Sequence, residues 1–289
     1  MSAHSESAAA RERAVLNPVS NTALLTAAAR AIENARPDRI FRDDLARTMA
    51  GAKGPLMTKR YDRAGLNEFI AIRTRYIDDA LESHALEDDV RQIVIVAAGM
   101  DTRAYRLDWS PGTIVYELDR PELFVIKNEM LRAANVEPRC RRVTVGVDLL
   151  DDWSQALQNA GYRPERPTVW AVEGLLFFLT ETAVHMLLSR AARLSASGSC
   201  LVTDMVNRRF LSNPWTQQFL QAMKADGAPW QFGVDDPASL LDACSWTAVD
   251  IKEPGQEGAH FGRWPYQVPP PSVVQAPRSF LMRAERSRP

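Results

Sequence analysis

The sequence has few of the residues that build metal centres and disulfide frameworks. It contains only three cysteines, Cys140, Cys200 and Cys244, and four histidines, and none of them forms a closely spaced pair or cluster. This spacing supports neither a disulfide framework nor a bound metal. The formal net charge of −1 is also small, so we expect no overall attraction to nucleic acid or to an anionic membrane.

Long apolar runs are missing as well. No run approaches the roughly 18 residues that cross a membrane, and the first residues, MSAHSESAAARERAV, lack the apolar core of a signal peptide. We therefore expect a cytoplasmic protein with a disordered tail at residues 1–13. Hydrophobic residues make up 46% of the chain, a share typical of globular proteins, and this predicts a single domain over residues 14–289.

From residue 90 onward, segments typical of β-strands alternate with segments typical of helices. Because the strand segments are nearly continuous apolar runs, the pattern predicts a mostly parallel α/β sheet covered by helices on both faces. Segments 21–36 and 66–84 predict helices that cap the sheet, and segment 207–227 predicts one further helix. The predicted strands are residues 93–97, 113–118, 142–147, 168–173, 199–204, 246–251 and 279–285.

This pattern divides the domain into three parts. We expect a helical cap over residues 14–90, a cofactor-binding core over residues 91–205, and a lid with the final strands over residues 206–289. Between the last two strands lies HFGRWPYQVPPPSVVQAPR, residues 260–278. A long proline-rich loop is typical of a lid or of a disordered linker, and the three aromatic residues of this loop favour a lid that faces the substrate.

The carboxyl ends of four predicted strands carry small or acidic residues. In chain order these are Ala97-Ala98-Gly99, Asp119, Asp148 with Leu149, and Glu173. Ligands of open α/β sheets bind at this edge, and Asp119 lies 20 residues after Gly99, the spacing of an acid that binds ribose hydroxyls. Asp148 followed by an apolar residue suits an adenine ring, although this acid could instead cap the next helix.

Three acids at one edge would repel phosphates and attract a cationic ligand. S-adenosylmethionine fits this edge because it has an adenine, a ribose diol, an ammonium and a sulfonium, but no phosphate. A strand-end acid taken alone is often a solvated or capping residue. The inference therefore depends on the four strand ends together.

The same stretches resemble a known family. They include AAGMDTRAYRL, ELDRP and EGLLFFL, together with TALLTAAARAIE and IRTRY near the N-terminus. Over roughly residues 17–285 the chain resembles the leucine carboxyl methyltransferase-like family of S-adenosylmethionine-dependent methyltransferases, especially its bacterial branch. The resemblance implies a class I, Rossmann-like methyltransferase fold with a seven-stranded sheet.

The resemblance also implies a role for each matching position. Arg73 would hold the methionine carboxylate, and Gly99 would lie under the methionyl part. Asp119 would bind ribose, Asp148 and Leu149 would meet adenine, and Glu173 would lie near the amino-acid end. Ala97 is a further expected contact, at a position where the eukaryotic pattern has glycine.

The methyl acceptor is less defined by the sequence than the cofactor. A carboxylate acceptor needs no base, whereas a phenol or an alcohol does, and the sequence shows no clear base. His260 and Tyr266 are the catalytic candidates, and Trp264, Tyr266 and Arg209 are the candidates for acceptor contacts. We expect O-methylation of a carboxylate or acidic hydroxyl on a small molecule, such as a secondary metabolite. Methylation of a protein C-terminal carboxyl group and a cofactor-binding scaffold without methyl transfer remain alternatives.

Overall fold

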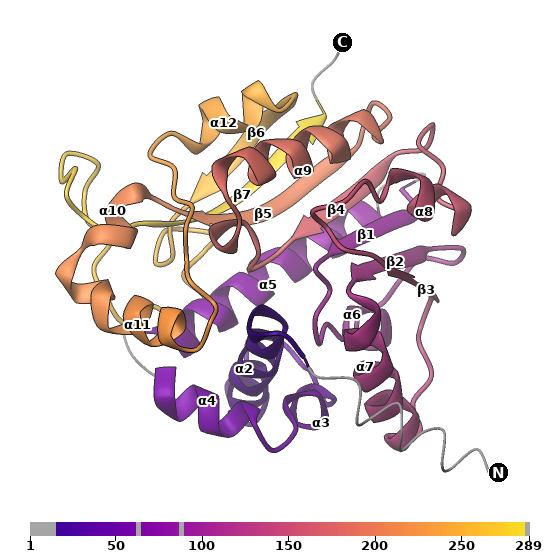
Figure 1. Ribbon diagram of the computed structural model, residues 1–289, viewed down its shortest axis with the longest axis horizontal. Coiled ribbons are helices and arrows are strands. Elements are labelled where there is room, and N and C mark those ends of the chain that lie inside the picture. The colour runs from indigo at the N-terminus through magenta and orange to yellow at the C-terminus, as the bar shows by residue number, and fades with distance from the viewer. Residues whose placement is uncertain (1–15, 62–64, 87–89, 287–289) are drawn as a thin grey trace.

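In the computed structural model, the described residues are 16–61, 65–86 and 90–286, so the expected tail at residues 1–13 lies outside them. Seven strands form one sheet in the order β3-β2-β1-β4-β5-β7-β6 (Figure 1). β1 to β5 pair in parallel, and β7 is antiparallel to both of its neighbours. The strands are β1 (Gln92–Val96), β2 (Ile114–Asp119), β3 (Arg141–Gly146), β4 (Thr168–Val172), β5 (Cys200–Val206), β6 (Trp246–Lys252) and β7 (Ser279–Arg286). The predicted mostly parallel, seven-stranded sheet is confirmed.

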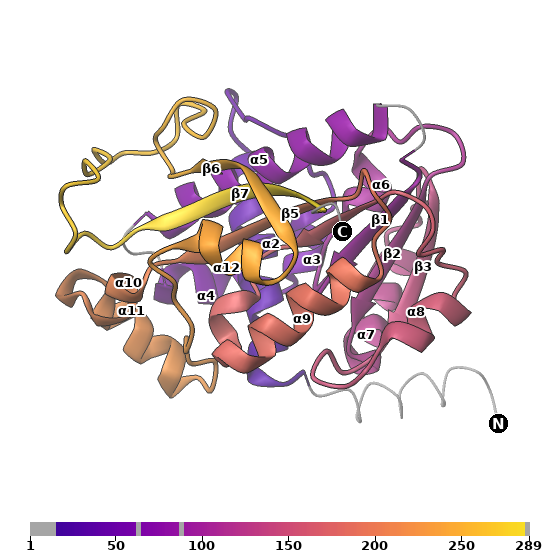
Figure 2. The same cartoon turned by 90° about the horizontal axis from the view of Figure 1, so that it is seen from above.

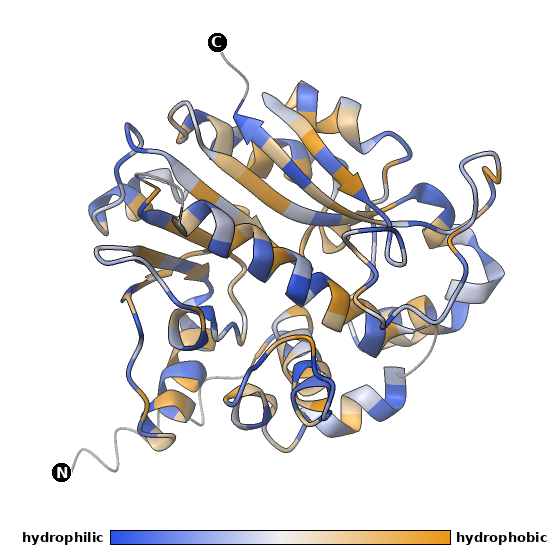
Figure 3. Cartoon of the chain, turned by 180° about the vertical axis from the view of Figure 1, so that it is seen from behind, coloured by the Kyte–Doolittle hydropathy of each residue, from blue (hydrophilic) through white to orange (hydrophobic). Residues whose placement is uncertain are grey.

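Side chains of the central strands alternate between two apolar layers. In β1, Val94 and Val96 join the core under α8, α9 and α12, whereas Ile93 and Ile95 join the core under α5 and α6. This alternation follows from the two-residue period of a strand. Figure 2 shows α5 and α9 on opposite sides of the sheet, and Figure 3 shows hydrophobic residues concentrated in the strands. The helices named here are α5 (Leu66–Leu86), α6 (Arg103–Arg106), α8 (Ser154–Asn159), α9 (Glu181–Arg193) and α12 (Pro237–Ala243).

Among the N-terminal helices, α5 packs on one face of the sheet against β4, β5 and β7, and α2 lies at the carboxyl end of β1. Asn17 begins α2, because its side chain accepts a hydrogen bond from the backbone N–H of Ser20 at 2.7 Å. α2 then packs against α3, α4 and α5. The bounds are α2 (Pro18–Asn34), α3 (Ala46–Ala50) and α4 (Gly54–Tyr61), and α7 (Pro121–Ala133) lies beside α3.

The single helix expected over residues 207–227 is two helices, α10 (Arg208–Ser212) and α11 (Pro214–Ala225). Pro214 cannot donate a backbone hydrogen bond, so it ends one helix and starts the next. The Asn213 side chain caps the second helix by accepting from the backbone N–H of Trp215 at 2.9 Å. None of the helices in the described ranges is long and apolar enough to cross a membrane.

Residues 253–278 connect β6 to β7 without regular secondary structure, and we call them the proline-rich loop. Two arginines fix this loop. The Arg263 guanidinium donates to both carboxylate oxygens of Glu33 on α2, at 2.9 and 3.0 Å. Arg278 donates to the carbonyl oxygens of Pro269 and Pro270, at 3.0 and 2.7 Å. The loop is therefore an ordered part of the domain, and it lies at the same end of the sheet as α10 and α11 (Figure 2).

Candidate functional site

A cavity of about 280 Å³ lies at the carboxyl ends of the first four strands, and we call it the strand-end cavity. The strand order reverses between β1 and β4, so the cavity occupies the switch point where α/β sheets bind ligands. Its lining contains all seven residues that the sequence predicted for the cofactor, which are Arg73, Ala97, Gly99, Asp119, Asp148, Leu149 and Glu173.

The small residues after β1 make room for a helix as well as for a ligand. Gly99 has a φ of +49°, and a Cβ built on it would lie 2.9 Å from Cβ of Ala23 on α2. Glycine is therefore required both by the backbone conformation and by the close approach of α2. Ala97 also has a positive φ, +54°, and an alanine in this left-handed region costs roughly 1–2 kcal/mol.

Asp119 has a structural role that the strand-end pattern did not reveal. Its Oδ2 accepts a hydrogen bond from the backbone N–H of Gly99 at 2.7 Å, and its Oδ1 accepts from the backbone N–H of Arg120 at 2.7 Å. Burial raises the pKa of Asp119, and these two hydrogen bonds oppose that rise. The carboxylate thus joins the ends of β1 and β2, and it retains lone pairs for hydroxyl donors in the cavity.

Asp148 does not cap the following helix. Its Oδ1 accepts from the backbone N–H of Leu150 at 3.0 Å, and its Oδ2 pairs with the Arg120 guanidinium at 2.8 Å. Asp152 instead accepts from the backbone N–H of Ser154, at the first turn of α8. The structure therefore keeps Asp148 at the cavity, next to the half-buried side chain of Leu149.

Arg73 projects from α5 into a buried cluster of charges. Its Nε donates to Oε1 of Glu173 at 2.9 Å, and its Nη1 donates to Oδ2 of Asp204 at 3.0 Å. Its Nη2 has no hydrogen bond to any of the described residues. Arg73 is thus held by two protein carboxylates, and one guanidinium nitrogen remains for a ligand carboxylate.

Glu173 is ionised because it lies between two arginines. Its Oε2 accepts from Nη1 of Arg103 at 2.8 Å, and Arg103 is held in turn by Asp78 and Asp101. Burial alone would raise the pKa of Glu173, but Arg103 and Arg73 outweigh burial and lower it to about 2. Glu173 therefore keeps its negative charge throughout the physiological pH range.

Two sets of residues in or behind the lining of this cavity were not predicted from the sequence. Asp204, in the second half of β5, lies behind the lining, where it pairs with Arg73 and also accepts from the backbone N–H of Gly174 at 2.6 Å. It could have been found as the acid that closes the fifth predicted strand. α2 contributes a polar face to the lining, and the four-residue spacing of its threonines was the available signal. The polar lining residues of α2 and its N-cap are Asn17, Ser20, Thr22, Thr26 and Arg30.

The donors and acceptors of the strand-end cavity fit S-adenosylmethionine. Among the described lining residues, Arg30, Arg73 and Arg120 each pair with a carboxylate, so no cluster of unpaired cations is available for a chain of phosphates. Asp119 offers acceptors for ribose hydroxyls. The Gly99 turn lets a ligand lie close to the backbone.

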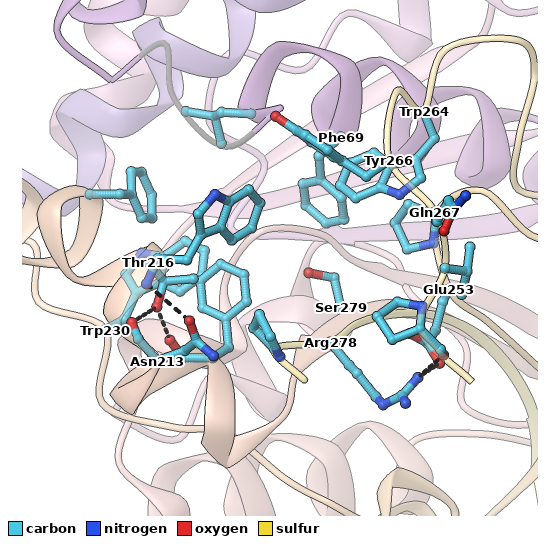
Figure 4. Close-up of a pocket in the computed structure, with 18 residues that line it drawn as sticks. Phe69, Asn213, Thr216, Trp230, Glu253, Trp264, Tyr266, Gln267, Arg278 and Ser279 are labelled. Atoms are coloured by element: carbon cyan, nitrogen blue, oxygen red, sulfur yellow. Dashed lines mark hydrogen bonds and ion pairs between the residues drawn. The ribbon is translucent and has the colours of Figure 1, made fainter. Parts of the chain in front are cut away.

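A second cavity, of about 310 Å³, lies between α5, α10, α11 and the proline-rich loop, and we call it the aromatic cavity (Figure 4). Trp264 and Tyr266, predicted as acceptor contacts, line it. Arg209 and His260 do not; Arg209 lies exposed on α10, and the exposed His260 accepts a hydrogen bond from the backbone N–H of Gly262. The aromatic lining residues are Phe69, Phe210, Trp215, Phe219, Trp230, Trp264 and Tyr266.

The two cavities share a wall. Phe69 lines the aromatic cavity, and Arg73, one turn later on α5, lines the strand-end cavity. The Arg73 guanidinium lies 5.5 Å from the centroid of the Phe69 ring. A second contact joins the two cavities. Phe178, in the short 3-10 helix η1 (Leu176–Phe178), lines the strand-end cavity, and Trp230 lines the aromatic cavity. The centroids of these two rings lie 6.1 Å apart.

Comparison with known proteins agrees with this geometry. A relative in Parafrankia sp., named as an S-adenosyl-L-methionine-dependent methyltransferase, is 42% identical over 195 residues, which are 64% of this chain and 63% of the relative. A relative of the same description in Streptomyces avermitilis is 37% identical over 276 residues and covers 90% of this chain and 93% of its own length. A solved Thermobifida fusca structure described as a methyltransferase superposes with a TM-score of 0.59 at 15% identity, covering 94% of both chains.

The fold is therefore that of class I methyltransferases, as predicted. The leucine carboxyl methyltransferase profile matches residues 23–192, which include all seven predicted cofactor positions, six at the strand ends and Arg73 on α5. The chain belongs to the leucine carboxyl methyltransferase family and is an S-adenosylmethionine-dependent methyltransferase.

Proposed function

We propose that the enzyme methylates an acidic oxygen, either a carboxylate or an acidic hydroxyl, on a small apolar molecule bound in the aromatic cavity. A secondary metabolite is the kind of acceptor that we expect. The shared wall between the two cavities is the main support, because it places an aromatic site beside the residues expected to hold the cofactor. Aromatic walls around a few polar groups are typical of small-molecule sites.

The lining residues support an acceptor that is already ionised. When bound, S-adenosylmethionine supplies an electrophilic methyl group, and the protein has to align the acceptor and exclude water. No histidine is among the described residues that line either cavity. A carboxylic acid has a pKa near 4, so it is already ionised at neutral pH and needs no base. A neutral hydroxyl would need a base to remove its proton. Tyr266 is the remaining catalytic candidate at the aromatic cavity.

The family description favours a carboxyl acceptor, and it also keeps a protein C-terminal carboxyl group as the main alternative. The aromatic cavity, with a volume of about 310 Å³ and seven aromatic lining residues, has the size and lining typical of a small-molecule site. We therefore prefer the small-molecule acceptor.

The test is transfer of labelled methyl groups from S-adenosylmethionine to a panel of aromatic carboxylic acids, phenols and peptides. We expect product from the small acids or acidic phenols, at a rate that stays flat from about pH 6 to 8 for a carboxylate. Trp264→Ala and Tyr266→Ala should lower acceptor turnover at least tenfold while cofactor affinity stays within about twofold. Val274→Ala, an exposed change on the same loop, is the control. Transfer to peptides alone would contradict the proposal.

A further inference from the structure

Most polar side chains of the aromatic cavity already have partners inside the protein. Thr216 donates to the carbonyl oxygen of Asn213 at 2.9 Å, and the Asn213 side chain caps α11. Arg278 donates to the carbonyl oxygens of the proline-rich loop and to Oε1 of Glu253 at 2.5 Å. These groups hold α11 and the loop in place, so they have little capacity left for a ligand.

Glu253 is the exception among the charged residues. It comes directly after β6, and its side chain is only 15% exposed. Arg278 uses one carboxylate oxygen, and Oε2 has no hydrogen bond to any of the described residues. Burial raises the pKa of Glu253, and Arg278 opposes the rise. This oxygen is not among the buried atoms that lack a partner, so water can reach it, and a ligand donor could take the place of that water.

The position of Glu253 separates it from the wall shared with the strand-end cavity. Figure 4 shows Glu253 and Arg278 on the opposite side of the cavity from Trp230, with Ser279 and Gln267 nearby. The side chains of Ser279 and Gln267 also line the cavity and form no hydrogen bond with the described residues. The cavity therefore has an aromatic middle and a polar end that contains one carboxylate.

We propose that the aromatic cavity selects acceptors that carry a protonated amine, and that Glu253 is the residue that recognises it. This inference rests on the proposed small-molecule acceptor and narrows its class to aromatic amines with an acidic oxygen at the other end. An ammonium group gains a charge-assisted hydrogen bond from Glu253 and attraction from the surrounding ring faces. Among the described lining rings, Phe69 already has Arg73 over it, and Trp230 stacks on both Phe177 and Phe210, so the attraction to a ligand cation has to come from the remaining rings.

The test uses binding, and it is independent of turnover. Tryptamine, tryptophol and 3-indolepropionate share an indole ring and differ in the charge of the side chain. Each is titrated by calorimetry into the protein saturated with S-adenosylhomocysteine. We expect tryptamine to bind at least tenfold more tightly than 3-indolepropionate. Glu253→Gln should weaken tryptamine binding at least tenfold and change tryptophol binding less than threefold, whereas Glu257→Gln, an exposed acid on the same loop, should change neither.

Three outcomes separate this inference from the proposed function. Equal binding of the three probes, or tryptamine binding that Glu253→Gln leaves intact, would overturn the amine preference and leave the aromatic acceptor site standing. Failure of all three probes to bind would overturn both. If Glu253→Gln does not fold, the selectivity of the parent protein among the probes decides, because a preference for 3-indolepropionate refutes the inference directly.

Discussion

Replacing Glu173 with glutamine tests the charge cluster under the strand-end cavity. The pKa of Glu173 falls from its ordinary 4.5 to about 2 in the folded protein, which corresponds to about 3 kcal/mol of stabilisation. Because the pKa in the folded state is the lower one, this stabilisation is complete above pH 4.5 and is lost as the pH falls toward 2. Glutamine cannot carry the charge that compensates Arg73 and Arg103, so Glu173→Gln should lose about 3 kcal/mol at pH 7.

Urea unfolding at two pH values measures this loss. At pH 3.5 the parent protein retains roughly 2 kcal/mol of the contribution, so the difference between parent and Glu173→Gln should narrow by about 1 kcal/mol. Glu165→Gln, an exposed change in the turn before β4, should stay within about 0.5 kcal/mol of the parent. A difference that does not change with pH would show that the loss comes from packing and not from charge.

Three further substitutions test other parts of the site. Arg73→Lys should weaken cofactor binding at least tenfold by calorimetry, since an ammonium cannot span Glu173, Asp204 and a ligand, while Arg75→Lys on the same helix should not; equal affinity in both would exclude a ligand contact. Asp119→Ala should lose about 1.5–3 kcal/mol of cofactor affinity and also some stability in urea, because two backbone N–H groups lose their acceptor, and unchanged affinity would leave it a purely structural residue. Ala97→Gly should lower the free energy of unfolding by less than about 0.5 kcal/mol or raise it, because glycine relieves the positive φ. Ala171→Gly, inside β4, should lower it by about 1–2 kcal/mol. Equal losses in the two variants would refute backbone strain at Ala97.

The strands and their ends were predictable because a strand that is buried on both faces of the sheet is a continuous run of apolar residues. A strand such as Ile93–Val96 is apolar at every position, and its observed bounds differ from the predicted ones by a single residue. Once the strands are parallel, their carboxyl ends must share an edge. That is why Gly99, Asp119 and Glu173, far apart in the sequence, line one cavity.

Contacts between side chains from distant segments were not predictable. Arg73 pairs with Asp204 across 131 residues, and Arg263 reaches Glu33 across 230. Helix and strand periodicities relate only residues that are close in sequence. They cannot predict such pairs, because each pair depends on the path of the chain between its two members. The same reason explains His260, whose loop position suggested a catalytic role but which is exposed and lines neither cavity.

The two arginines that fix the proline-rich loop leave only its exposed part free to vary in length. Arg263 fastens one end of residues 264–277 to Glu33. Arg278 fastens the other end to Glu253 and also binds the carbonyl oxygens of Pro269 and Pro270 within the segment. Doubling the length of such a segment costs only about 0.6 kcal/mol of closure entropy, and Val273 and Val274 at its crest are exposed. A change of length at Val273 and Val274 should therefore leave the strand-end cavity intact, because no residue of the proline-rich loop lines that cavity.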